Sequence, residues 1–161
     1  MRVSIERLRE IINYDPDTGV VTWAKSRRSA PAGKVAGCLD KRCGYVSIRI
    51  DFKQYLMHRL IWFYVYGVFP EHQIDHIDGD KSNNRLANLR EATISQNSQN
   101  RRRGQGRSKL LGAHWLGDVK RWRSSIGIAG KNFYLGIFDT PEEAHECYKN
   151  AKRKMHEFGT I

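Results

Sequence analysis

Residues 101–109, near the middle of the chain, contain no apolar side chain and carry five basic ones. Such a segment cannot bury itself in a hydrophobic core, and its two glycines favour an extended, flexible connection. A chain of 161 residues with a linker at this position is expected to form two small modules, 1–100 and 110–161. The division excludes a large enzyme barrel built around one core.

The charge of the chain indicates a polyanionic partner. There are 28 Lys and Arg residues against 17 Asp and Glu residues, which gives a net charge of +11. Residues 101–161 contribute +7 of this charge and residues 1–100 contribute +4. Nucleic acid is the first candidate, since a basic protein of this kind can neutralise phosphates. In the linker, Arg101, Arg102 and Arg103 are expected either to contact a phosphate backbone or to belong to a solvated hinge, and both roles are compatible.

Membrane and secreted classes fit the sequence poorly. The longest strongly apolar run, Leu60–Phe69, is too short to span a bilayer and is interrupted by Gly67. Near the N-terminus apolar residues alternate with charged ones, so there is no signal-peptide core. The chain has three cysteines, an odd number, which argues against a disulfide framework and suits a reducing compartment. Cys38 and Cys43 are expected to be free thiols instead of half a zinc site. We expect a cytoplasmic protein with no membrane partner.

Hydrophobic periodicity predicts both helices and strands in the first module. Ser4 precedes an apolar face at helical spacing, formed by Ile5, Leu8, Ile11 and Ile12. Further along, apolar and polar residues alternate as they do in half-buried strands, and Gly67 is placed to end a second helix. The expected strands are 20–23, 44–51 and 53–57, and the expected second helix is 58–66.

One segment, 73–97, is richer in polar side chains than a folding core requires. Its pattern predicts a short strand, an Asp-Gly turn, an asparagine-rich loop and a helix. Thr93 and Gln96 have the spacing of a capping box, so the helix is expected to begin just after Thr93, with Asn97 about one turn into it. Taken alone, dense asparagines favour a loop that satisfies its own backbone groups.

This segment and its surroundings resemble the HNH nuclease motif of phage and intron-encoded endonucleases. The resemblance is clear from about residue 44 to residue 101, and it is carried by "HRLIW", "YGVFP", "IDHIDGDKSNNRLANLREAT" and "QNSQN". It implies a ββα-metal (His-Me finger) core at about 72–101, with a histidine base and one divalent ion.

Four residues take their roles from this resemblance. His76 matches the general base of the family, and Asp75 matches the metal-binding acid beside it. Asn88 matches the asparagine that braces the loop and orients the histidine. Asn97 stands at the third motif position, so the chain looks like an H-N-N variant in which Asp75 and Asn97 are the metal ligands.

These residue types fit phosphodiester hydrolysis. A histidine with a pKa near neutrality can take a proton from water. Carboxylate and amide oxygens suit a hard ion, so we expect Mg²⁺ first, Mn²⁺ second and Zn²⁺ last. Arg85 and Arg90 are candidate phosphate contacts, and equally surface charges. Other polar neighbours are expected to act differently: His58 in the core or behind the base, His72 in an exposed loop, Asn84 as a loop brace, and Asp78 and Asp80 as solvated turn residues.

The second module is predicted to contain three strands, 111–115, 121–128 and 132–138, followed by a helix. Thr140 is the expected cap of this helix and Pro141 its first residue. An apolar stripe is expected to lie across the sheet: Ala144, Cys147, Tyr148, Ala151 and Met155. The basic residues are expected on a solvated face: Lys149, Lys152, Arg153 and Lys154.

The pattern "GAHW…RWRSSIGIAGKNFYLGIFDTPEEAHECYKNAKRKMHEFG" resembles the DNA-binding domain of the plant APETALA-two/ethylene-response-factor (ERF) type. The resemblance implies three antiparallel strands and a helix, with the sheet in the major groove of DNA. His114 and Tyr134 match positions that touch DNA in that family. Arg121, Arg123 and Lys131 are further basic candidates on or beside the sheet.

The expected fold class is α+β: a ββα-metal nuclease module and a small three-stranded antiparallel sheet with one packed helix. The expected function is a metal-dependent DNA endonuclease, site-specific and of the homing or phage-encoded type, which nicks or cleaves double-stranded DNA as a monomer or homodimer. The alternative is a DNA-binding regulator with an inactive nuclease motif, and the presence of the four motif residues favours the enzyme. An RNA-directed module is disfavoured, since no stacking-aromatic RNA motif is present.

Overall fold

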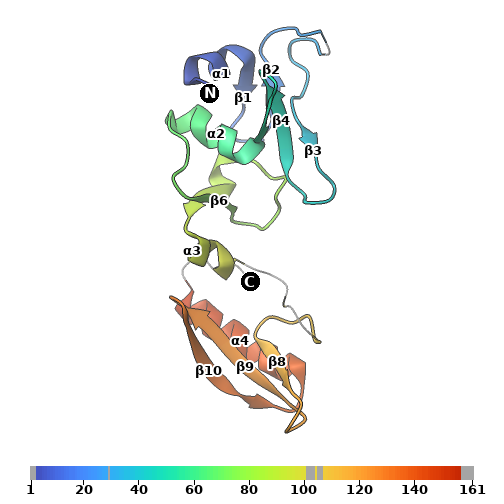
Figure 1. Cartoon of the computed structure of the whole chain (residues 1–161), viewed down its shortest axis with the longest axis vertical. Helices are drawn as coiled ribbons and strands as arrows, with labels where there is room; N and C mark the ends of the chain where they lie inside the picture. The colour runs from blue at the N-terminus through green and yellow to red at the C-terminus, as the bar shows by residue number, and fades with distance from the viewer. Residues whose placement is uncertain (1–2, 29, 101–103, 105–106, 157–161) are drawn as a thin grey trace. The chain divides into compact units, whose positions relative to one another are not determined.

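The computed structural model describes residues 3–28, 30–100, 104 and 107–156, so Arg101, Arg102 and Arg103 lie outside the described residues. The chain divides into two compact units, 1–92 and 93–161. The elements in chain order are α1 (Ile5–Ile11), β1 (Ile12–Tyr14), β2 (Val21–Trp23), β3 (Cys38–Leu39), β4 (Val46–Ile50), β5 (Lys53–Leu56), α2 (Met57–Tyr66), β6 (Gln73–His76), the short 3₁₀ helix η1 (Leu86–Asn88), β7 (Leu89–Ala92), α3 (Ile94–Gln99), β8 (Ala113–Leu116), β9 (Arg121–Ile128), β10 (Lys131–Phe138) and α4 (Pro141–Met155). Figure 1 labels most of them.

The first unit combines small antiparallel sheets with two helices. β1 pairs with β2, and β4 lies between β3 and β5. The Ser4 side chain accepts a hydrogen bond from the Arg7 backbone N–H and so caps α1, as predicted. Ile12 was expected on this helix, but its backbone is extended and it pairs with Trp23 in β1. It is still fully buried, because the strand turns the same apolar side chain into the core.

The core of this unit gathers apolar residues from α1, α2 and the strands. α2 ends at Gly67, whose φ of 75° is a left-handed conformation that residues with a Cβ rarely adopt. The buried face of α2 contains His58 together with apolar residues, so this histidine lies inside the unit. The buried apolar residues of the core are Leu8, Ile11, Ile12, Val21, Ala36, Ile48, Ile50, Met57, Leu60, Ile61, Phe63, Ile74 and Leu89.

β6 and β7 form an antiparallel hairpin whose long connection contains η1. The register places Asp75 opposite Arg90 and His76 opposite Leu89. Thr93 then caps α3: its hydroxyl accepts from the Gln96 N–H, and the Gln96 side chain accepts from the Thr93 N–H. The capping box predicted from the sequence is confirmed. Along the chain the order is strand, strand, helix, with β6 and β7 in the first unit and α3 in the second.

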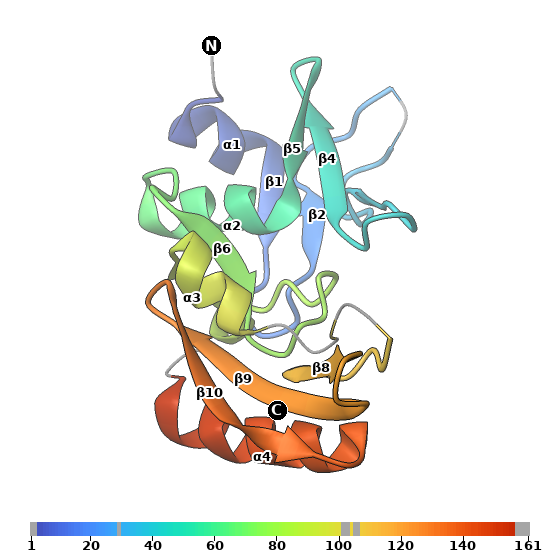
Figure 2. The same ribbon diagram turned by 60° about the horizontal axis from the view of Figure 1, so that its bottom comes forward.

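The second unit contains an antiparallel sheet in the order β10-β9-β8, with α4 packed against it (Figure 2). Along β9 the side chains of Trp122, Ser124 and Ile126 are buried, while Arg121 and Arg123 are exposed. The Ser124 hydroxyl donates to the Ala144 carbonyl of α4 at 2.8 Å, which identifies the buried face as the face toward the helix. The three strands and the helix predicted for this module are observed.

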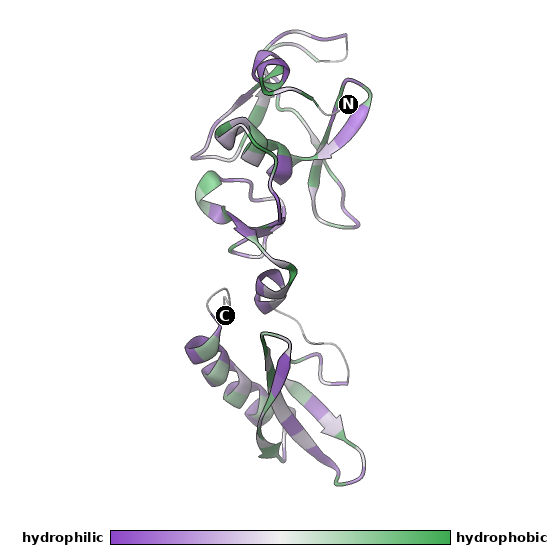
Figure 3. Ribbon diagram, turned by 60° about the vertical axis from the view of Figure 1, so that its left-hand side comes forward, coloured by the Kyte–Doolittle hydropathy of each residue, from purple (hydrophilic) through white to green (hydrophobic). Residues whose placement is uncertain are grey.

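One prediction about α4 was wrong. Lys152 was placed on a solvated face, but only 2% of it is exposed, whereas Met155, placed on the buried stripe, is 47% exposed. Lys152 follows Ala144 and Tyr148 at four-residue spacing, so it lies on the face that these two buried residues define. Its aliphatic stem can be buried like an apolar side chain. Figure 3 shows the hydrophobic and hydrophilic residues mixed along this helix.

Two exclusions drawn from the sequence can be compared with the structure. Within the described part of the chain, no helix is long and apolar enough to cross a membrane. Within the same described residues, Cys38, Cys43 and Cys147 form no disulfide, and Cys38 and Cys43 are exposed.

Candidate active site

The candidate site begins where β6 ends. The last three residues of β6, Ile74, Asp75 and His76, are all buried. Successive side chains of a regular strand point to opposite faces, so two adjacent polar residues can share one site only where the strand ends. His76 is the last residue of β6, and the turn at Asp78-Gly79 follows it. Asp75 and His76 therefore lie at the end of the strand, as expected from the sequence.

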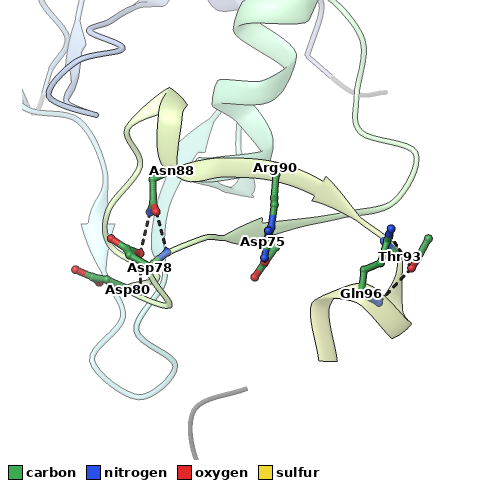
Figure 4. Close-up of polar contacts among 7 residues, drawn as sticks. All are labelled: Asp75, Asp78, Asp80, Asn88, Arg90, Thr93 and Gln96. Carbon is green, nitrogen blue, oxygen red and sulfur yellow. Dashed lines mark hydrogen bonds and ion pairs between the residues drawn. The ribbon is translucent and has the colours of Figure 1, made fainter. Parts of the chain in front are cut away.

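Asp75 is held by Arg90 on the neighbouring strand (Figure 4). The Arg90 Nε and Nη2 atoms donate to the same carboxylate oxygen, Oδ2, at 3.0 and 2.8 Å. Only 6% of the Asp75 side chain and 23% of the Arg90 side chain are exposed. Arg90, a candidate phosphate contact, is thus engaged with a site carboxylate. The pair fixes the orientation of Asp75 within the hairpin.

Replacing Arg90 with alanine should destabilise the protein, because it leaves the buried Asp75 carboxylate without this cation. Breaking a buried pair costs about 3 kcal/mol. The free energy of unfolding in urea measures the effect. Arg42→Ala is the matched control, since Arg42 pairs with Asp40 while 92% exposed, and exposed pairs contribute about 0–1 kcal/mol. Equal losses in both variants would mean that the Asp75 pair behaves as a surface pair.

His76 lies in a buried cluster of rings and amides. Its Nε2 atom is 3.4 Å from Asn84 Oδ1. The His58 ring meets it edge-on with a centroid separation of 5.0 Å, and the Tyr45 ring lies 6.0 Å away. Burial lowers the pKa of His76, although the Asn84 contact and the Asp78 and Asp75 charges act in the opposite direction. The neutral ring, which is the form that can accept a proton, is therefore favoured near neutral pH.

Asn88 joins the two ends of the loop between β6 and β7. Its Nδ2 donates to Asp78 Oδ1 at 2.9 Å and to the Asn83 carbonyl at 2.8 Å, and its Oδ1 accepts from the Asp78 N–H at 3.0 Å. Its backbone carbonyl accepts from the Ile77 N–H. These bonds brace the loop, whereas the amide beside His76 belongs to Asn84. The role of Asn88 in orienting His76 stays a prediction.

The other acidic residues of the loop stabilise its turns. Asp78 accepts from Asn83, Asn88 and the Asp80 N–H; burial alone would raise its pKa, but these hydrogen bonds together lower it below its ordinary value. The Ser82 hydroxyl and N–H hold the Asp80 carboxylate and lower its pKa. Both aspartates behave as turn residues. Arg85, another candidate phosphate contact, donates from Nε to the Asp17 carbonyl at 2.8 Å and ties the loop to the N-terminal turn.

Asn97 lies on α3, in the second unit, so its meeting with Asp75 stays a prediction. Among the residues that the structure describes, no group of three or more His, Cys, Asp and Glu side chains is placed to hold a metal ion. A site with one carboxylate and one amide would not form such a group. Two oxygen donors of this kind fit a hard divalent ion that keeps water in its remaining positions. The donor set therefore fits the ion that the motif implies.

Comparisons with known proteins identify the segment that carries this site. Residues 55–99, from β5 to the end of α3, match a family model described as HNH endonuclease. The chain is also 30% identical to Protein 3.8 of Escherichia phage T7 over 115 residues, which cover 68% of this chain and 94% of that protein. The chain belongs to the HNH endonuclease family. In a structure of DNA binding and cleavage by the HNH homing endonuclease I-HmuI, the aligned part has 27% identity and a TM-score of 0.43. The alignment covers 62% of this chain and 57% of the I-HmuI chain, so this chain spans little more than half the length of I-HmuI.

Three residues surround His76, and sequence reasoning anticipated one of them, His58, in part. Asn84 was expected only to brace the loop, and His58 was expected either in the core or behind the base. Tyr45 was not considered. The structure brings these three residues around His76 from the loop, from α2 and from the segment before β4. The position of His58 inside "HRLIW", part of the HNH resemblance, is the sequence signal that could have indicated it.

His58 should make the stability of the HNH module sensitive to acid. It is 4% exposed, its Nδ1 has no hydrogen-bond partner among the described residues, and burial lowers its pKa to about 3 from an ordinary value of 6.5. In the unfolded chain His58 therefore binds a proton below about pH 6.5, whereas in the native chain it binds one only below about pH 3. The free energy of unfolding should fall in this window by up to about 1.4 kcal/mol per pH unit.

Urea unfolding at several pH values in this window measures that slope. In His58→Gln the part of the slope due to this group should disappear. In His72→Gln, which changes an exposed histidine of the same module, the slope should remain. A His58→Gln protein with the parental pH dependence would show that His58 is not the group responsible.

In the second unit, the register places four of the five DNA-contact candidates on the sheet face opposite α4. His114 pairs with Arg123, and Tyr134 pairs with Ser125. Arg121 lies two residues from Arg123 on the same face, and its Nε donates to Asp139 at 2.7 Å. The fifth candidate, Lys131, pairs with Ile128, on the face toward α4, and its side chain is exposed at the end of the sheet.

Proposed function

We propose that this HNH protein is a divalent-metal-dependent endonuclease that hydrolyses phosphodiester bonds in double-stranded DNA. The observation that carries the proposal is the burial of His76 beside Asp75 at the end of β6, inside the segment that matches the HNH endonuclease model. The similarity to a phage protein supports a phage-encoded enzyme, and we extend the proposal to site-specific cleavage.

His76 acts as the general base. When its Nε2–H is donated to Asn84 Oδ1, the lone pair that can accept a proton from water is on Nδ1. His58 and Tyr45 enclose the ring from two sides and limit its rotation. Asn88 and the loop that it braces hold the strand end from which His76 projects. Each of these contacts restricts the base to few orientations, which is what general-base catalysis requires.

Asp75 and Asn97 hold the ion, with Mg²⁺ proposed before Mn²⁺ and Zn²⁺. When bound, an ion of this kind neutralises the charge that develops on the phosphate and the departing 3′ oxygen. Arg90 holds the orientation of the Asp75 carboxylate in the hairpin. One such site cuts one strand, so a monomer would nick DNA and a homodimer could cut both strands.

The second unit supplies further DNA contacts. We assign the sheet face opposite α4, with His114, Arg121, Arg123 and Tyr134, as a DNA-binding surface of the ERF type. The basic linker connects it to the nuclease module. Two weak surfaces on one duplex gain affinity through effective concentration. The two units thus share binding, while only the first carries the base.

The direct test of the function is relaxation of supercoiled plasmid DNA by the purified chain, with Mg²⁺ and with a chelator. The proposal predicts open-circular or linear product that depends on Mg²⁺. A DNA-binding regulator with an inactive motif would shift the plasmid in a gel and leave it supercoiled under both conditions. That result would overturn the enzymatic function.

Deletion of residues 110–161 should leave a nuclease that cuts but is poorly targeted. The base and Asp75 lie upstream of the deletion, and the basic residues of the sheet and of α4 are lost with it. Each lost phosphate contact should flatten the slope of log affinity against log salt by about 0.9. Titration of binding at several salt concentrations measures this slope. A folded, truncated protein with parental affinity, slope and site choice would show that residues 110–161 do not provide the DNA-binding surface.

A further inference from the structure

The tip of the β4–β5 hairpin has a conformation that its sequence does not favour. Ile50 pairs with Lys53, so Asp51 and Phe52 form a two-residue turn. Their φ angles of 45° and 66° are both left-handed. Turns of this type strongly prefer Asn-Gly or Asp-Gly, because a residue with a Cβ is strained there. A large aromatic residue at the second position is unfavourable for folding.

Burial does not offset this strain. Phe52 is 100% exposed, the most exposed of the large apolar residues in the described part of the chain. Figure 2 shows the end of the hairpin projecting from the first unit. A side chain that strains the backbone and contacts no core contributes nothing to the stability of the native state. Strained residues of this kind concentrate at binding sites.

Phe52 borders a cationic cavity. An open cavity of about 520 Å³ lies between β4 and the 23–38 segment, and Phe52, Trp23, Arg27, Lys34 and Arg49 line part of its wall. The Arg27 guanidinium stacks on the Trp23 ring at 4.1 Å.

The charge of the cavity is not neutralised from within. No carboxylate in the described residues forms an ion pair with the three lining cations, Arg27, Lys34 and Arg49. Asp51, an acidic lining residue, is paired with Arg7 at 3.4 Å. The cavity therefore presents a net positive charge beside an exposed aromatic wedge.

We infer that this hairpin tip and cavity form a second DNA-binding element, located in the nuclease module itself. The inference rests on the proposed function, because it takes duplex DNA as the ligand. The three cations lie against phosphates of the backbone, and Phe52 inserts at a base step and partly unstacks it. Apolar wedges flanked by basic residues bind and kink duplex DNA in this way. The charge of the cavity favours DNA over an apolar protein partner.

The wedge predicts opposite effects of one substitution on stability and on DNA binding. Phe52→Gly removes the strain of the left-handed turn, so the melting temperature should stay the same or rise. The same change should lower the affinity for a mixed-sequence duplex about tenfold, the size expected from loss of one aromatic–base contact. Phe52→Leu keeps an apolar wedge and should restore most of the affinity.

Binding is measured with full-length protein in the His76→Ala background, where the duplex stays intact. Duplexes that carry 2-aminopurine at successive positions report unstacking by increased fluorescence. This fluorescence increase should occur with the parental protein and with Phe52→Leu, which keeps an apolar side chain. It should disappear with Phe52→Gly.

The contribution of the cavity is measured by its salt dependence. The triple variant R27A/K34A/R49A should flatten the slope of log affinity against log salt by up to about 2.7, because each of the three lost phosphate contacts contributes about 0.9. The matched control K25A/R28A/K41A changes exposed cations of the same unit that do not line the cavity, and it should keep the parental slope.

Two outcomes would overturn the inference. The first is parental affinity and fluorescence in Phe52→Gly. The second is an equal change of salt slope in the cavity and control triples. Either result would leave the nuclease proposal untouched, since plasmid cleavage by the parental chain is measured separately. Absence of that cleavage, with the binding effects present, would refute the nuclease proposal and retain the DNA-binding element.

Discussion

Replacing His76 with alanine should lower the single-turnover rate of DNA cleavage by about 10²–10⁴-fold and leave DNA affinity nearly unchanged. The base acts on the chemical step alone, and its ring is buried among His58, Tyr45 and Asn84. Quenched-flow or gel assays with enzyme in excess measure the rate, and a gel shift without Mg²⁺ measures the affinity.

Because His76 is only 4% exposed, its loss could also disturb folding, and the melting temperature must be compared with that of the parent. His72→Ala is the matched control: this histidine lies four residues earlier, is exposed, and donates its backbone N–H to Glu91, a bond that the substitution keeps. The control should cut at the parental rate. If His76→Ala itself cuts at that rate, His76 is not the base.

Asp75→Ala and Asn97→Ala should each move the Mg²⁺ midpoint of cleavage to higher concentration, by about tenfold or more, because each removes one oxygen ligand. A metal titration of the single-turnover rate measures the midpoint. For Asp75 the additional loss of the Arg90 pair must be separated from ligand loss, and Arg90→Ala measures that part alone.

Ser98→Ala is the control for Asn97, since it changes an exposed residue next to it on α3 and should keep the parental midpoint. An unchanged midpoint in both ligand variants would place the ion elsewhere. Asp78 and Asp80 would then be tested next, although their hydrogen bonds mark them as turn residues.

Local elements were predicted well because short-range patterns determine them. The capping box at Thr93 and the N-cap at Thr140 each predicted where a helix begins, and both are present in the structure. The alternation in β4 and the glycine that ends α2 are equally local signals. Each depends on residues that are neighbours in the chain, so spacing alone is sufficient.

The contacts that shape the candidate site were not predictable in this way. The Asp75–Arg90 pair depends on the register of β6 against β7, and the edge-on contact of His58 with His76 depends on how α2 packs. Lys152 was misplaced because its charge outweighed its four-residue spacing from Tyr148. Long-range packing decides these cases, and local spacing does not reveal it.

We propose that His76 and Asn97, which lie in different units, serve one catalytic site. A double-mutant cycle of the single-turnover cleavage rate tests it directly, with His76→Ala, Asn97→Ala and the double variant at the parental Mg²⁺ midpoint, where loss of an oxygen ligand lowers the rate. Residues that act as one unit are strongly non-additive. We predict that the double variant cuts no more slowly than the slower single variant. Losses that multiply in the double variant would contradict a shared site.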